Sequence, residues 1–141
     1  MNDSILDYFD VLAGFFGALF AWFFGSWDGL LKMLAALCII DYCSGVACAY
    51  IQNSLSSNVG FKGIARKVYM FTLVGIAHVI DRELLGQTAL LRDAVIFFYL
   101  ANEGLSILEN AIVIGIPVPD ALKSKLLQLQ DKKDDNHEPN E

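Results

Sequence analysis

The sequence predicts an all-α membrane protein with about four transmembrane helices, a short C-terminal amphipathic helix and a disordered tail. The first observation is composition: 55% of the 141 residues are hydrophobic and 18% are charged, whereas soluble domains average about 25% charged. The second is that charged residues avoid the long apolar runs. The third is that these runs approach the length that crosses a hydrocarbon core of about 30 Å. We expect one membrane domain over residues 1–129 and a charged, disordered tail over 130–141.

The first predicted span covers residues 11–27, which follow an acidic start. It is uncharged and rich in Phe and Trp, and its three glycines are more usual in membrane helices than in soluble ones. Seventeen residues is the short limit for a span. The alternative is an interfacial helix among the lipid headgroups, which leaves three spans. Residues 26–29 predict a tight turn that makes the first two helices a hairpin.

The second predicted span, residues 30–51, carries Asp41 near its midpoint. An ionised carboxylate there costs several kcal/mol unless it is paired, hydrated or protonated. We therefore expect it to face other helices or water. By the helical repeat, the face of this helix that carries Asp41 consists of small and polar residues: Cys38, Asp41, Ser44, Gly45, Cys48 and Gln52. Such a face suits helix packing or a water-lined surface, and an oligomeric pore combines the two.

Residues 53–63 are rich in Ser, Asn and Gly and predict a loop at the membrane surface. The third predicted span follows over residues 64–85. Its uncharged part is short, and flanking charges such as Lys67 and Asp81 extend it by snorkelling. We interpret His78 as a packing or interfacial histidine, with a proton relay as the alternative.

The fourth predicted span covers residues 93–116 and carries a stripe too polar to face lipid. Gly115, Pro117 and Pro119 predict its end. An amphipathic helix over 120–129 then rests on the membrane or the bundle. The candidate helix-packing or pore-facing residues of the second and fourth spans are Asp41, Ser44, Gly45, Cys48, Tyr99, Asn102, Glu103, Ser106 and Asn110.

The basic residues predict the orientation. Residues 53–67 carry three Lys or Arg and the segment after Pro117 carries four. Two spans separate these segments, so they share a side, which the positive-inside rule makes cytoplasmic. Both termini are then cytoplasmic if residues 11–27 span, and the N-terminus is external if they do not.

Enzyme motifs are missing from the sequence. It holds two histidines and no HExxH, GxSxG or CxxC. The three cysteines, Cys38, Cys43 and Cys48, are five residues apart on one helix, so they cannot share a metal or bond to one another there. We expect the three cysteines to be buried and to serve as small packing residues. The net charge of −6, without a basic stripe, does not favour nucleic-acid binding. We expect no catalysis, metal or cofactor.

Short motifs in a fixed order resemble one known family. They are DYCSG at 41–45, SSNVGFKGI at 56–64 followed by RK at 66–67, NEGLSILEN at 102–110, and GIPVP at 115–119. Together they resemble the phage-lysis and toxin-secretion holin family over roughly residues 28–129.

The resemblance implies a holin that oligomerises in the bacterial cytoplasmic membrane and opens lesions. An endolysin or a toxin then crosses without needing a specific contact. The family has no catalytic residues to carry over. A small ion channel or transporter subunit using Asp41, His78 and Glu103 is the alternative, and a scaffold anchoring a partner through its tail is another.

Overall fold

The computed structural model describes residues 2–122 and 124, and this part of the chain forms four helices. They are α1 (Asn2–Phe24), α2 (Gly29–Ile51), α3 (Ser57–Leu84) and α4 (Leu90–Ile114). Each contains a stretch long and apolar enough to cross a membrane. This confirms the predicted all-α membrane fold with four candidate spans.

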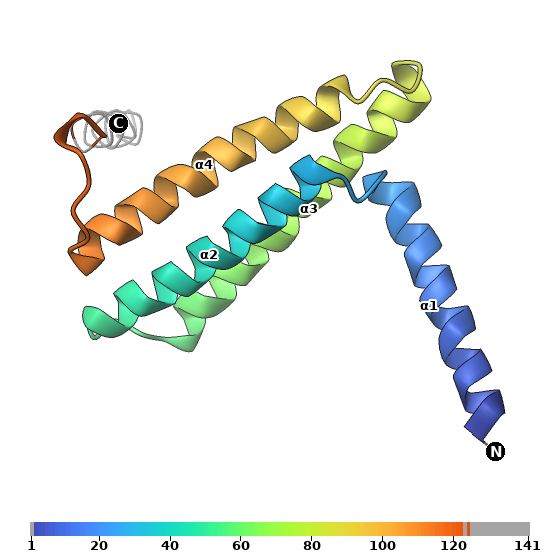
Figure 1. The fold of residues 1–141 in the computed structure, drawn as a ribbon, viewed down its shortest axis with the longest axis horizontal. Coiled ribbons are helices and arrows are strands. Elements are labelled where there is room, and N and C mark those ends of the chain that lie inside the picture. The colour runs from blue at the N-terminus through green and yellow to red at the C-terminus, as the bar shows by residue number, and fades with distance from the viewer. Residues whose placement is uncertain (1, 123, 125–141) are drawn as a thin grey trace, which may run out of the picture.

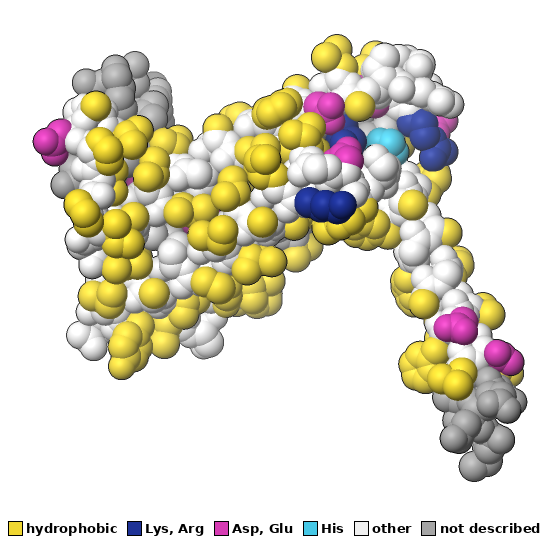
Figure 2. Space-filling view, viewed as in Figure 1, with side chains coloured by type: hydrophobic (Ala, Val, Ile, Leu, Met, Phe, Trp, Pro, Cys, Tyr) yellow, Lys and Arg dark blue, Asp and Glu magenta, His cyan; other side chains and the backbone are white. Residues whose placement is uncertain are grey.

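Helices α2, α3 and α4 form an elongated bundle in which α3 runs antiparallel to α2 and α4 (Figure 1). Its small apolar core is made of Leu31, Leu34, Cys38, Met70, Val74 and Ile96. Most large apolar side chains instead lie on the surface (Figure 2). A bilayer solvates such a surface, whereas water would not. The fold is therefore organised as expected for lipid surroundings, with polar contacts inside the bundle.

Helix α1 points away from the bundle (Figure 1), so the predicted hairpin with α2 is wrong. The predicted turn exists, but α1 meets α3 instead of lying along α2. Phe23 packs where Gly75 has no side chain, since a Cβ there would overlap its ring. Gly25 has a positive φ of 77° and abuts His78. All described side chains from residue 6 to residue 22 are exposed.

Several predicted boundaries shift. Helix α3 begins at Ser57, inside the predicted loop 53–63. Ser, Asn and Gly favour a loop locally, but the ring of Tyr42 packs over Gly60 and Gly63, and this tertiary contact stabilises the helix. Helix α1 begins at Asn2, well before the predicted residue 11, and ends at Phe24, short of the predicted residue 27.

Helix α4 begins at Leu90, three residues before the predicted start. It ends at Ile114, two residues before the predicted end, and Gly115 adopts the left-handed conformation of a C-cap. Residues 120–122 and 124 are helical. The remainder of the predicted amphipathic helix, and the whole predicted tail over 130–141, lie outside the described residues.

Candidate functional site

A buried group of charged side chains joins the three helices of the bundle. Lys67 of α3 donates to Asp41 Oδ2 of α2 at 2.7 Å and to Glu103 Oε2 of α4 at 2.5 Å. The exposed fractions of these side chains are 15% for Lys67, 15% for Asp41 and 8% for Glu103. We call these three residues the charged cluster. With all three ionised its formal charge is −1.

Asn110 extends the charged cluster along α2 and α4. Its side-chain amide donates to Asp41 Oδ1 at 3.2 Å and to Ser44 Oγ at 2.9 Å. The Cys48 thiol donates to the Asn110 carbonyl oxygen at 3.3 Å. Gly45 faces the same contact, and a Cβ there would lie at an ordinary van der Waals distance of 3.7 Å from the Asn110 side-chain nitrogen. Polar groups that lipid would not satisfy thus bond to one another across the two helices.

The other predicted site residues lie apart from these hydrogen bonds. Tyr99 is half-buried and lines an apolar groove between α3 and α4. Ser106 is half-buried one turn beyond Glu103, and Asn102 is exposed. Gln52, expected on the polar face of α2, is exposed as well. The structure therefore brings together Asp41, Ser44, Gly45, Cys48, Glu103 and Asn110 from the predicted set.

Lys67 is the member of the charged cluster that the sequence reading missed. Snorkelling was the wrong role for it, because its ammonium turns inward between two carboxylates. The helical repeat could have found it, since residues 67, 70, 74 and 77 share one face of α3. Met70, Val74 and Ala77 on that face are buried, whereas the neighbouring Arg66 is exposed.

His78 lies at the other end of α3, eleven residues from Lys67, which is about 16 Å along the helix. It abuts Gly25 in the turn after α1. The structure therefore does not join His78 to Asp41 and Glu103 in a relay. Of the cysteines, Cys38 and Cys48 are buried as expected, but Cys43 is exposed. Within residues 2–122 and 124, no group of three or more His, Cys, Asp and Glu side chains is placed to hold a metal ion.

A second polar group, centred on Arg92, ties α1 and the turn to α4. Arg92 is 3% exposed. Its guanidinium donates to the carbonyl oxygens of Phe24 and Ser26 at 3.0 and 3.2 Å. It also donates to Asp28 Oδ2 at 2.8 Å. Arg92 therefore fixes the direction in which the chain leaves α1.

Asp81, fully buried at the end of α3, holds the start of α4. Its carboxylate accepts from the backbone N–H groups of Leu91 and Arg92 at 3.0 and 2.7 Å. Ala89 precedes α4 and has no side chain that could cap it, so a residue of the preceding helix satisfies these donors. Snorkelling was also the wrong expectation for Asp81. Its position explains why α4 starts earlier than predicted.

Asp28 caps α2 while it pairs with Arg92. Its Oδ1 accepts from the Leu31 N–H at 3.0 Å. Burial raises the pKa of Asp28, but the hydrogen bonds from Arg92 and Leu31 and the Arg92 charge together hold it below its ordinary value of 3.8. The structure therefore favours the ionised form of this carboxyl.

Acid should weaken this turn. A carboxyl whose pKa is lowered by folding contributes stability above its unfolded pKa, and that contribution is lost as the pH falls through the lower folded value. We expect the Tm of the detergent-solubilised protein to fall more steeply below about pH 4 than that of Asp28→Asn. Glu83→Gln, altering an exposed carboxylate of α3, should follow the wild type. Equal pH profiles for wild type and Asp28→Asn would contradict this role.

Comparisons with known proteins identify the family of this chain. A model of the bacteriophage holin family matches residues 18–131. An uncharacterized protein of Listeria innocua is 48% identical over 123 residues, 87% of each chain. An uncharacterized 14.9 kDa protein of Clostridium perfringens is 40% identical over 83% of this chain and 89% of its own. A probable holin of Bacillus phage phi105 is 34% identical over 77% of this chain and 79% of its own. No solved structure matches.

Proposed function

Because the chain belongs to the bacteriophage holin family, we propose that it oligomerises in the bacterial cytoplasmic membrane and forms lesions. An endolysin, or in another setting a toxin, then crosses to the outside, and host lysis or protein release follows. The bilayer and further copies of the chain are its partners. The cargo needs no specific contact, because a water-filled lesion passes whatever fits through it.

The charged cluster is the observation that carries this proposal. In a single copy it is enclosed by α2, α3 and α4, which suits a protein that accumulates without opening the membrane. Its excess negative charge makes this closed packing costly in a low-dielectric interior. A water-filled lesion would hydrate the same groups. One set of side chains thus supports a closed and an open state, and neighbouring copies can shift the balance between them.

We further propose that both termini are cytoplasmic. Four spans put the N-terminus, the α2–α3 connection and the segment after Pro117 on one side. Lys62 and Arg66 near that connection are exposed and suit the inner surface, even though Lys67 turns into the bundle. Reporter fusions to Met1 and Glu141 test the orientation. An external N-terminus with an internal C-terminus would contradict it.

Expression in bacteria that also make a cytoplasmic endolysin tests the function. A lesion-forming protein should stop growth abruptly and release a cytoplasmic reporter enzyme. An ion channel should abolish the membrane potential and retain the enzyme, whereas a scaffold should do neither. Retention of the enzyme by cells with normal amounts of the protein would overturn the proposal.

Asp41→Leu sharpens this experiment. It leaves Lys67 paired with Glu103 and removes the excess charge, so the variant should insert, remain closed and fail to release the enzyme. Asp41→Asn keeps the size and some hydrogen bonds, and its defect should be milder. Ile39→Leu alters an exposed position of the same helix and serves as the matched control, with release on the wild-type schedule.

A further inference from the structure

Helix α1 is a candidate span without a partner along most of its length. Residues 6–22 are exposed, including apolar side chains such as Phe15 at 63%. Arg92 binds the carbonyl oxygens of Phe24 and Ser26, so α1 cannot swing back onto its own bundle without breaking buried hydrogen bonds. The surface of α1 is therefore available to a neighbour.

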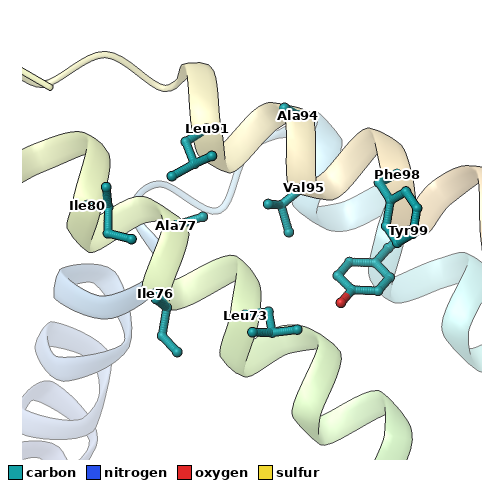
Figure 3. Close-up of a pocket in the computed structure, with 9 residues that line it drawn as sticks. All are labelled: Leu73, Ile76, Ala77, Ile80, Leu91, Ala94, Val95, Phe98 and Tyr99. Atoms are coloured by element: carbon teal, nitrogen blue, oxygen red, sulfur yellow. The ribbon is translucent and has the colours of Figure 1, made fainter.

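The bundle has an apolar groove between α3 and α4 (Figure 3). Its volume is about 400 Å³, and Leu73, Ile76, Val95 and Phe98 are among its lining residues. Ile76 and Phe98 are 44% and 61% exposed. By the helical repeat, Lys62, Arg66 and Tyr69 lie on the same face of α3 as the groove residues Leu73 and Ile76, and all three are exposed. This surface can accept a helix that is apolar in its outer half and acidic at its inner end.

The contact of Gly25 with His78 sets these two residues at one depth. All helices rise about 1.5 Å per residue. If α1 crosses the membrane in the same direction as α3, each residue of α1 therefore lies at the depth of the α3 residue whose number is 53 higher, because 78 minus 25 is 53. Asp10 is then level with residue 63, between Lys62 and Arg66. Asp7, Asp10, Lys62 and Arg66 are exposed, and none is in an ion pair within the described chain. The same register sets Phe20 level with Leu73, at the end of the groove nearest Arg66.

We propose that α1 of one copy packs on the α3–α4 groove of a second copy, with its acidic end against Lys62 and Arg66. The proposal rests on the oligomeric lesion proposed above and names the contact that builds it. Each copy offers one α1 and accepts another. Such a head-to-tail contact closes into rings when the rotation allows it.

Cysteine crosslinking in membranes tests this contact. Cys38→Ala, Cys43→Ser and Cys48→Ala provide a cysteine-free background. Phe16→Cys is combined with Tyr69→Cys, since the register makes these exposed residues level and Tyr69 lies on the groove side of α3. The control combines Phe16→Cys with Ile39→Cys, because Ile39 is as exposed as Tyr69 and lies at a similar depth on α2. Copper phenanthroline then oxidises neighbouring thiols, and gels separate dimers from monomers.

We expect dimers from the Phe16–Tyr69 pair and from a mixture of the two single variants, at least about fivefold more than from the control pair. Asp10→Asn should lower this yield by about two- to fivefold, as expected for an exposed ion pair. A crosslink within one chain, or equal yields from both pairs, would overturn the proposal. If glutaraldehyde still detects oligomers and the reporter enzyme still escapes, then only the contact fails. Loss of oligomers and of release in the uncrosslinked wild type would count against the proposed function instead.

Discussion

Lys67→Met is expected to give one of the largest losses of stability of any single substitution in the bundle. It leaves Asp41 and Glu103 enclosed without a cation, and breaking a buried pair in this way costs about 3–5 kcal/mol. We expect the protein to accumulate poorly in the membrane and to lose cooperative unfolding in detergent. Quantitative immunoblots of membranes and thermal unfolding of the purified protein measure both effects.

Arg66→Met is the matched control, since it removes the same charge from the adjacent but exposed residue of α3. Its effect on stability should stay below about 1 kcal/mol. A triple variant, Asp41→Asn with Lys67→Met and Glu103→Gln, removes every charge of the cluster and should recover membrane content. Equal losses from Lys67→Met and Arg66→Met would show that the charged cluster does not hold the bundle together.

Arg92→Met should produce the second large loss. The substitution leaves the carbonyl oxygens of Phe24 and Ser26 without their buried donor, and it removes the partner of Asp28. Losing hydrogen bonds to a buried charged group costs about 3 kcal/mol or more. Helix α1 should then become mobile relative to α3. Fluorescence of Trp22 and Trp27, together with the Tm in detergent, reports the change.

Arg82→Met is the control for this second change. The Arg82 side chain is 38% exposed, pairs with Glu83 at 2.9 Å and lies over the Trp22 ring at 5.7 Å. Its loss should therefore cost no more than about 1 kcal/mol. If Arg82→Met mobilises α1 as strongly as Arg92→Met, then the cation over Trp22, and not the buried guanidinium, fixes the direction of α1.

The contrast between residues 30–51 and 53–63 shows where the sequence sufficed. In the first stretch an apolar run of spanning length dominates, so the helix of the structure matches the prediction within a residue at each end. In the second stretch Ser, Asn and Gly indicated a loop, yet α3 already begins at Ser57. Tyr42 of α2 packs against Gly60 and Gly63 of α3. This contact involves a second helix, so the local sequence of residues 53–63 carries no information about it.

The candidate site divides in the same way. The sequence by itself determined that Asp41 and Glu103 had to avoid lipid, because an ionised group is costly in hydrocarbon whichever helices lie around it. Asn110 and Ser44 followed from the helical repeat. Only the tertiary structure decided that Lys67 is their counter-charge, that Asp81 caps α4, and that Arg92 turns α1 outward. Those roles depend on which helices become neighbours, and the periodicity of one helix carries no information about the partner that faces it.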